Sequence, residues 1–302
     1  MTDTVGVVGA GALGTLLIAR LSAAGFGVCA VSRSTGRRAA LAREFPAAAL
    51  GGDGAVLAGA GLVFLCVKSY DTEAAGRTLA EADLKSAAIC SLQNGWGHMD
   101  LLAARLPRTP LLAGATSLGA YLDEKGVLHA STEGCTTVAP WRSEDFPSAE
   151  RAVSLLSRAG LHARTSPDAR ATLWRKLVLN SAVNPVAALA QRPNGALLDS
   201  PPLFRLAEEA AREAARVGSR LGWMEAGFDP AAALRAILAE TRENRSSMTE
   251  DLAHGRRTEV DEINGAVVRL ARGAGEPAPL QEALLTLVRA AEGRRRAPAG
   301  DP

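Results

Sequence analysis

The stretch Thr4-Val-Gly-Val-Val-Gly9-Ala-Gly-Ala-Leu-Gly14 decides the fold of the first half of the chain. Its apolar beginning, residues 4–8, is typical of a buried strand, and residues 15–24 predict a helix. A second apolar run over residues 26–31 predicts the next strand. A G-x-G-x-x-G turn that follows a strand and opens a helix is typical of a dinucleotide-binding domain. The alternative is a glycine-rich turn in an unrelated α/β domain.

Each glycine of this turn has a specific physical role in such a domain. Gly9 allows the tight turn, Gly11 lets backbone N–H groups approach a pyrophosphate, and Gly14 lets the helix pack closely on the strand. The N-terminus of the helix adds a field that favours phosphate. We therefore expect the pyrophosphate of a dinucleotide to bind at Gly9, Ala10, Gly11, Ala12, Leu13 and Gly14.

The residues after the second strand indicate which dinucleotide binds. NAD-binding domains usually carry an acidic residue there for the ribose 2′-hydroxyl. This chain has Ser32-Arg33-Ser34 instead, and the Arg33 guanidinium can bind a 2′-phosphate with help from Ser32 or Ser34. We therefore predict NADP (NADPH) as the cofactor. The alternative is an ordinary solvated loop, which suits Arg37 and Arg38 better than Arg33.

The rest of the first half alternates between strands and helices. Further strands are expected at residues 62–67, 87–92, 111–116 and 161–165, with a hairpin of 127–130 and 135–139 closing the sheet and helices over 71–82 and 146–159. This alternation predicts a doubly wound, mostly parallel sheet. Lys68 and Asn94 follow the carboxyl ends of two of these strands, which is the edge where such sheets bind ligands.

The second half has no strand pattern. Ser166 is expected to cap a helix over 168–184, and further helices are expected at 202–221, 230–240, 247–254, 259–274 and 280–292. The fold class predicted is an α/β, Rossmann-like N-terminal domain followed by an all-α domain. The expected boundaries are residues 1–165 for the NADP-binding domain, 166–292 for the helical substrate domain and 293–302 for a disordered tail.

One helix of the second half, Leu173-Trp-Arg-Lys-Leu-Val-Leu-Asn-Ser-Ala-Val-Asn-Pro185, carries a narrow polar stripe. Lys176, Asn180 and Asn184 are spaced four residues apart and therefore lie on one face, whereas the rest of the helix is almost entirely apolar. Buried polar groups need partners. The stripe therefore either holds other helices together or binds a small, polar, anionic ligand.

Composition and charge restrict the classes of function. A formal net charge of +2 gives no reason to expect a nucleic-acid or membrane surface, and the longest apolar run is too short to span a bilayer. The 4 cysteines and 4 histidines form no metal-binding pattern, so no metal site is expected. Without a basic leader or an apparent disulfide framework, the chain is expected in the cytoplasm.

Seven motifs taken together resemble the ketopantoate reductase (2-dehydropantoate 2-reductase) family over residues 4–290. They are GAGALG, VKSYD, QNGWG, LWRKLVLNSAVNP, RPNGAL, SSM and RRTEVDEINGAVV, in this order. The resemblance implies a Rossmann domain joined to a helical domain, with the active site in the cleft between them. It also implies reduction of ketopantoate to pantoate by NADPH, on the route to pantothenate and coenzyme A.

The resemblance also implies roles for individual residues. Arg33 would bind the 2′-phosphate, and Lys68, Asn94 and Ala120 would line the cofactor. Lys176 would donate the proton, and Glu259 would lie at the cofactor and active-site end. The substrate-binding positions would be Asn180, Asn184, Asn194 and Ser247, with Lys176.

Burial of Lys176 should lower its pKa and make it a better acid, whereas Glu259 should favour its charged form. The partner expected is a small 2-oxo acid, and the protein is expected to be a monomer or a homodimer. One alternative function is NADPH-dependent reduction of another 2-oxo acid by a paralogue of the family. A non-catalytic NADP-binding protein is the other alternative, disfavoured because Lys176 and Glu259 are both present.

Overall fold

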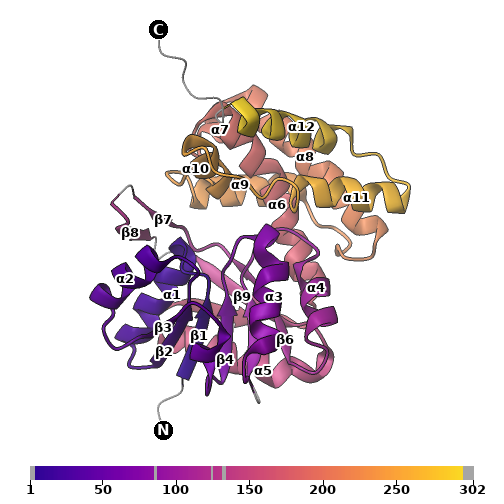
Figure 1. Cartoon of the computed structure of the whole chain (residues 1–302). Coiled ribbons are helices and arrows are strands. Elements are labelled where there is room, and N and C mark those ends of the chain that lie inside the picture. Colours follow the sequence, from indigo (N-terminus) through magenta and orange to yellow (C-terminus); the bar gives the residue numbers. More distant parts are fainter. Residues whose placement is uncertain (1–3, 85–86, 124, 131–133, 295–302) are drawn as a thin grey trace. The chain divides into compact units, whose positions relative to one another are not determined.

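The computed structural model describes residues 4–84, 87–123, 125–130 and 134–294, and the chain separates into two compact units. The first unit comprises residues 1–93 and 97–172, and the second comprises residues 94–96 and 173 onward. Figure 1 shows the strands of the first unit in indigo to magenta and the helices of the second unit in pink to yellow. The tail expected at 293–302 falls mostly on residues 295–302, which lie outside the described part of the chain.

An eight-stranded sheet forms the centre of the first unit. Its strands lie in the order β10-β9-β6-β5-β4-β1-β2-β3, and every neighbouring pair is parallel except β6 with β9. The prediction of a mostly parallel, Rossmann-like sheet is confirmed. The strand bounds are β1 Thr4–Val8, β2 Gly27–Val31, β3 Ala49–Gly51, β4 Leu62–Leu65, β5 Ala88–Ser91, β6 Leu111–Thr116, β9 Cys135–Pro140 and β10 His162–Thr165.

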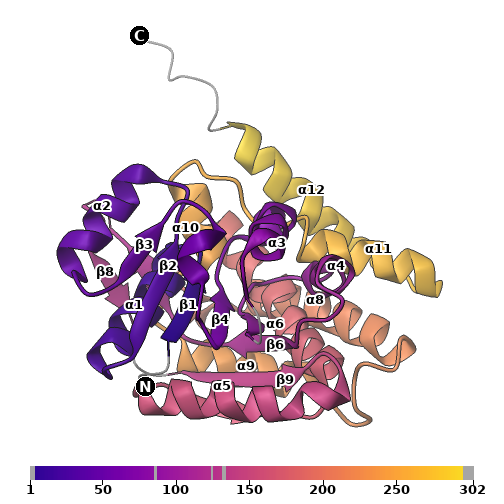
Figure 2. The ribbon, with the colours of Figure 1, turned by 60° about the horizontal axis from the view of Figure 1, so that its bottom comes forward.

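Helices cover both faces of this sheet. The helices α1 (Ala12–Ala23) and α5 (Phe146–Arg158) share one apolar core with the strands, whereas α3 (Thr72–Glu81) and α4 (His98–Arg105) pack on each other. Figure 2 shows α5 below the sheet and α3 and α4 above it. Central strands β4 and β5 are buried at every residue, which is why their sequences are continuous apolar runs.

The helix α2 (Thr35–Glu44) and strand β3 were not predicted, because neither has a long apolar pattern.

The predicted hairpin of residues 127–130 and 135–139 is wrong. Strand β8 (Leu128–Ala130) pairs with β7 (Ala120–Leu122) in a separate two-stranded sheet, which packs beside α1 (Figure 1). Strand β9 instead pairs with β6 and β10 in the main sheet. The physical reason is burial: β9 ends in three buried residues that complete the core, whereas β8 is largely exposed.

The second unit is helical, as the sequence predicted. Its largest fully buried side chain is Trp174, whose indole Nε1 donates a hydrogen bond to the carbonyl oxygen of Ala214 at 3.0 Å. Small residues of α8 face this core, so the helices approach closely. The helix bounds are α6 Ala169–Ala190, α7 Ala196–Asp199, α8 Pro201–Arg220, α9 Pro230–Glu240, α10 Ser247–Ala253, α11 Asn264–Ala274 and α12 Pro279–Arg294.

Both ends of the predicted helix over 168–184 need correction. Asp168, not Ser166, caps α6, because its carboxylate accepts a hydrogen bond from the backbone N–H of Ala171 at 2.9 Å. The helix also continues through Pro185 to Ala190 rather than ending before the proline. The proline is tolerated because the Asn264 side chain donates to the Ser181 carbonyl, the group that loses its helical donor at Pro185.

The helix predicted to begin at Glu259 begins at Asn264 instead. Residues 259–263 form a turn in which the backbone N–H of Ile263 donates to the Glu259 carbonyl. The Thr258 hydroxyl accepts from the Val260 N–H at 3.2 Å, which holds the chain in a turn before the helix. Glu259 is therefore a turn residue and not an acid of the first helical turn.

The turn between β1 and α1 has the geometry that its glycines predict. Gly9 has φ +99°, a left-handed conformation that only glycine adopts without strain. A Cβ atom on Gly14 would lie 1.9 Å from the Gly9 carbonyl oxygen, so the backbones of the helix and the loop leave no room for a side chain between them. A Cβ on Gly11 would meet no atom within 4 Å.

Substitution of Gly14 and of Gly11 by alanine should therefore have different effects on stability. We expect Gly14→Ala to lower the free energy of unfolding by about 2 kcal/mol or more, because the new methyl group overlaps a backbone carbonyl. We expect Gly11→Ala, the matched control, to change it by less than about 0.5 kcal/mol. Urea unfolding of the full chain without added nucleotide measures both. Equal midpoints for the two variants would contradict the close approach at Gly14.

Candidate active site

The carboxyl ends of three neighbouring parallel strands place most of the predicted cofactor residues at one edge of the first unit. Val8 of β1 lies beside Val31 of β2 and beside Leu65 of β4. The glycine loop follows β1, Arg33 follows β2, and Lys68 follows β4. Parallel pairing therefore brings these groups to a common edge, which is where ligands bind in open α/β sheets.

The glycine loop fits a pyrophosphate. Gly11 is the N-cap of α1, and no side chain accepts a hydrogen bond from the first turn of that helix. The first turn also contains no acidic residue. A Cβ on Gly11 would meet no atom within 4 Å, so an anion has room beside this cap to accept hydrogen bonds from the first turn and to gain from the helix dipole.

Arg33 is exposed and pairs with Asp71. The guanidinium Nη2 lies 2.7 Å from the Asp71 carboxylate, and the Arg33 side chain is 70% exposed. Ion pairs this exposed contribute little to stability. A phosphate with two negative charges can therefore compete with Asp71 for the guanidinium. Ser34 is less available, because its hydroxyl accepts from the Arg37 N–H as the cap of α2.

The interpretation of Arg37 as an ordinary solvated side chain is wrong. Its Nε donates to the carbonyl oxygen of Ala10 at 3.1 Å, and its Nη2 donates to the Thr15 hydroxyl at 2.6 Å. Burial lowers the pKa of Arg37. Arg37 thus ties α2 to the glycine loop. The one signal in the sequence was its position three residues after the capping Ser34.

Gln93 is a further residue whose role the sequence did not reveal. Its side chain is buried, and Nε2 donates to the Thr72 hydroxyl at 2.8 Å and to the Lys68 carbonyl at 3.4 Å. Gln93 therefore holds the backbone at Lys68. Ala120, a predicted cofactor residue, lies at the start of β7 in the hairpin that packs on α1.

The polar stripe of the second unit lies on α6, as predicted. Asn184 is 7% exposed and Asn180 is half-buried. Over residues 4–84, 87–123, 125–130 and 134–294, the side-chain amides of Asn180 and Asn184 find no hydrogen-bond partner. These two amides therefore do not join α6 to other helices. Since polar groups in a buried helix need partners, their arrangement favours a bound ligand.

Lys176, Glu259 and Asn94 form the charged end of this stripe. Burial lowers the pKa of Lys176 to about 8, and the negative charge of Glu259 opposes the shift. Glu259 is itself buried, and its Oε2 accepts a hydrogen bond from Asn94 Nδ2 at 3.2 Å. The sequence predicted both opposing causes, and burial is the larger. The pKa of the Lys176 ammonium therefore lies near neutral pH, where the group can release its proton.

Asn94 reaches Glu259 because residues 94–96, which follow β5, pack with the second unit. The Trp96 N–H donates to the Glu262 carbonyl at 2.9 Å, and its ring stacks on Trp223 with centroids 4.4 Å apart. A Cβ on Gly95 would lie 2.5 Å from the same carbonyl oxygen of Glu262. Gly95 and Trp96 therefore fix the segment that presents the Asn94 amide.

The remaining predicted substrate residues lie on other elements of the second unit. Asn194 is buried, and its Nδ2 donates to the Thr241 hydroxyl at 3.0 Å. Its Oδ1 is buried and has no hydrogen-bond partner among the described residues. Ser247 is the exposed first residue of α10, whereas Ser246 is the buried cap that accepts from the Thr249 N–H.

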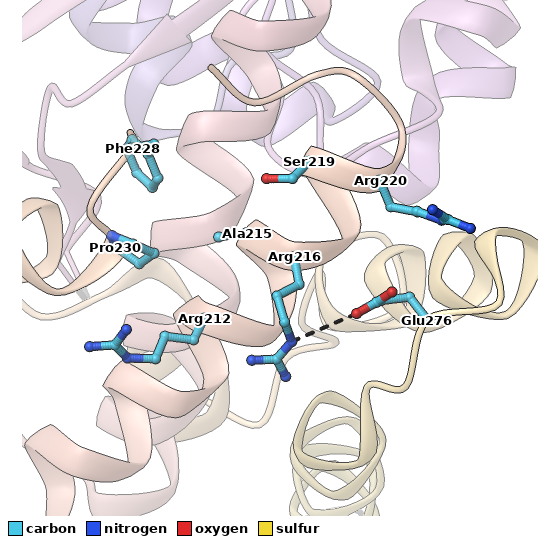
Figure 3. Close-up of a pocket in the computed structure, with 8 residues that line it drawn as sticks. All are labelled: Arg212, Ala215, Arg216, Ser219, Arg220, Phe228, Pro230 and Glu276. Carbon is cyan, nitrogen blue, oxygen red and sulfur yellow. Dashed lines mark ion pairs between the residues drawn. The ribbon is translucent and has the colours of Figure 1, made fainter. Parts of the chain in front are cut away.

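A hollow of about 620 Å³ on the second unit contains none of the predicted site residues. Figure 3 shows its arginines along α8, with Arg216 paired to Glu276 at 3.8 Å. Arg212 is also paired, with Glu208 at 2.5 Å. Because carboxylates already compensate these two guanidinium groups, the hollow is not favoured as the substrate site. Its lining residues are Arg212, Ala215, Arg216, Ser219, Arg220, Phe228, Pro230 and Glu276.

Among the described residues, no group of three or more His, Cys, Asp or Glu side chains is placed to hold a metal ion. No helix within them combines the length and the apolar character that crossing a bilayer requires.

The chain is similar to known reductases along nearly its whole length. Residues 5–143 match the family model described as ketopantoate reductase PanE/ApbA, and residues 168–292 match the model of its C-terminal part. The 2-dehydropantoate 2-reductase of Archaeoglobus fulgidus is 36% identical over 296 residues, covering 95% of this chain and 97% of that protein. The enzyme of the same name from Halobacterium salinarum is 36% identical over 240 residues, covering 80% of this chain and 78% of that protein.

Solved structures agree with this assignment. The PanE/ApbA family ketopantoate reductase of Ralstonia eutropha is 28% identical, with a TM-score of 0.86 over 97% of this chain and 100% of that one. A D-mandelate dehydrogenase solved with NADH and anilino(oxo)acetate has a TM-score of 0.88 over 97% of this chain and 100% of its own, but at 21% identity it shows the fold alone. The resemblance that the motifs predicted is confirmed, and the chain belongs to the ketopantoate reductase PanE/ApbA family.

Proposed function

We propose that this chain is an oxidoreductase that reduces 2-dehydropantoate to (R)-pantoate with NADPH. The observation that carries the proposal is the stripe on α6, in which Lys176 is paired electrostatically with buried Glu259 and is followed by two unpartnered amides. The name 2-dehydropantoate 2-reductase of relatives at 30–36% identity supports the choice of substrate. We also propose that the enzyme is cytoplasmic and that it is a monomer or a homodimer.

The substrate is a 2-oxo acid that also carries a hydroxyl group, and the stripe offers a group for each part. Lys176 donates a proton to the C2 carbonyl oxygen, on which negative charge grows during reduction. Asn180 and Asn184 offer amides to the hydroxyl group, and the unpartnered Oδ1 of Asn194 can accept from it. Ser247 can donate to the carboxylate.

The first unit holds the cofactor in this proposal. The glycine loop of Gly9 to Gly14 binds the pyrophosphate, and Arg33 exchanges Asp71 for the 2′-phosphate. Lys68 and Ala120 line the dinucleotide. Asn94, which belongs to the second unit, orients the Glu259 carboxylate. NADPH, when bound, supplies the hydride that C2 of the substrate accepts.

The direct test is NADPH oxidation at 340 nm by the purified protein with 2-dehydropantoate and with a panel of other 2-oxo acids. We expect rapid turnover of 2-dehydropantoate and little turnover of unhydroxylated analogues, because the amides have no partner without a substrate hydroxyl. Preferred turnover of another 2-oxo acid would reject 2-dehydropantoate as the substrate and leave the assignment as a reductase standing. NADPH binding without turnover of any 2-oxo acid would reject the assignment as an enzyme.

The pH dependence of turnover should report Lys176. A proton donor must be protonated, so we expect kcat to be constant below the pKa of about 8 and to fall above it. Glu259→Gln removes the charge that raises this pKa, so the fall of kcat should begin at a lower pH.

Lys176→Ala should reduce kcat by at least about 100-fold, with NADPH affinity retained. An alanine variant with near-normal kcat would remove Lys176 from the chemistry.

Charge reversal at Arg33 should change the preference between the two nicotinamide cofactors. We expect Arg33→Asp to weaken NADPH binding by at least about 10-fold while NADH binding changes little, because only NADPH carries the 2′-phosphate. Arg43→Asp, the same charge change at an exposed position of α2, is the matched control and should affect neither. Fluorescence titration with both cofactors measures the affinities. Equal weakening for NADH and NADPH would contradict the assignment of Arg33.

A further inference from the structure

Pro185 leaves a gap in the hydrogen bonds of α6. Proline has no backbone N–H, so the helix cannot supply the bond that would run from residue 185 to the Ser181 carbonyl. Ser181 is fully buried. A buried carbonyl without a donor is costly, so the donor must come from another part of the protein.

Asn264, the first residue of α11, supplies that donor. Its Nδ2 lies 2.8 Å from the Ser181 carbonyl oxygen, and its side chain is fully buried. The same Nδ2 donates to Gln281 Oε1, also at 2.8 Å. Asn264 Oδ1 is buried and has no hydrogen-bond partner among the described residues. The Asn264 amide is thus oriented so that its NH2 group donates to α6, while its oxygen accepts no hydrogen bond from the described residues.

Gln281 enforces this orientation. Its Nε2 donates to the Ala210 carbonyl at 2.8 Å and to the Ser181 hydroxyl at 3.2 Å, which leaves its Oε1 facing Asn264. The backbone N–H of Gln281 in turn donates to buried Glu213 at 2.9 Å. If the Asn264 amide turned over, its oxygen would face two other oxygens. The network therefore has one arrangement of donors and acceptors.

The position of this bond connects it to the polar stripe. Ser181 lies between Asn180 and Asn184, and Pro185 directly follows Asn184. The missing helical bond is therefore the one that would hold the turn carrying Asn184 to the turn carrying Asn180. We propose that Asn264 is a positioning residue of the reductase, which holds these two turns together and so sets the spacing of the substrate-binding amides. This inference rests on the proposed function of the stripe.

The test compares Asn264→Ala, Pro185→Ala and the double variant in the full chain. In Asn264→Ala the Ser181 carbonyl loses its donor, and we expect KM for the 2-oxo acid to rise by about 10-fold, with KM for NADPH unchanged. Pro185→Ala restores a backbone N–H for the same carbonyl. Adding it to Asn264→Ala should therefore return KM for the 2-oxo acid to within about threefold of the wild type.

Glu213→Gln is the matched control, because it weakens the same buried network without touching the Ser181 carbonyl. We expect it to lower the thermal unfolding temperature and to leave KM for the 2-oxo acid unchanged. A loss in Asn264→Ala that Pro185→Ala does not restore, or an equal rise of KM in Glu213→Gln, would overturn the proposal and leave Asn264 a structural residue.

A readout without substrate separates this inference from the proposed function. Backbone amide exchange over residues 181–190 should be faster in Asn264→Ala than in the wild type and should return to the wild-type rate in the double variant. If the wild type reduces no 2-oxo acid, the proposed function fails and the positioning role in a reductase fails with it. If the wild type is active but neither KM nor amide exchange responds to Asn264→Ala, only the inference fails.

Discussion

Burial of a polar stripe within an apolar helix is the constraint on which the second unit depends. An ammonium group and amides in the interior are costly unless they are paired, hydrogen-bonded or used by a ligand. At the charged end, Glu259 compensates Lys176, and Asn94 in turn donates to Glu259. The amides of Asn180 and Asn184 are left to a ligand. The stripe thus divides into a part that the protein satisfies and, in the proposed function, a part that the substrate satisfies.

Much of the fold could be predicted because it depends on local patterns. The glycine turn, the apolar strands and the amphipathic helices each carry their signal within about ten to twenty residues. Predictions failed where distant residues decide the outcome. Strand β9 belongs to the main sheet because β6 offers it an antiparallel edge, and α6 continues through Pro185 because Asn264 compensates the proline. Neither partner can be identified from the neighbouring sequence.

The same distinction applies to the candidate site. Residues whose proposed role depends on their own chemistry, such as Lys176 and Arg33, stood out by residue type and spacing. Arg37 and Gln93 did not, because they act through hydrogen bonds to the backbone at Ala10 and Lys68. The backbone carbonyls they bind have no signature in the sequence. A supporting residue of this kind is found only after the fold has placed its partner.

One short segment of the chain serves both ends of the stripe. Glu259 compensates the charge of Lys176, and five residues later Asn264 holds the turn before Asn184. The intervening residues form a turn closed by the bond from Ile263 N–H to the Glu259 carbonyl, so the two side chains are separated by a fixed length of ordered backbone. A proline on α6 makes this possible, because it frees the Ser181 carbonyl for a side chain of another element. In the proposed function, the helical bond that Pro185 removes therefore lets this one segment act both on the charge of Lys176 and on the spacing of Asn180 and Asn184.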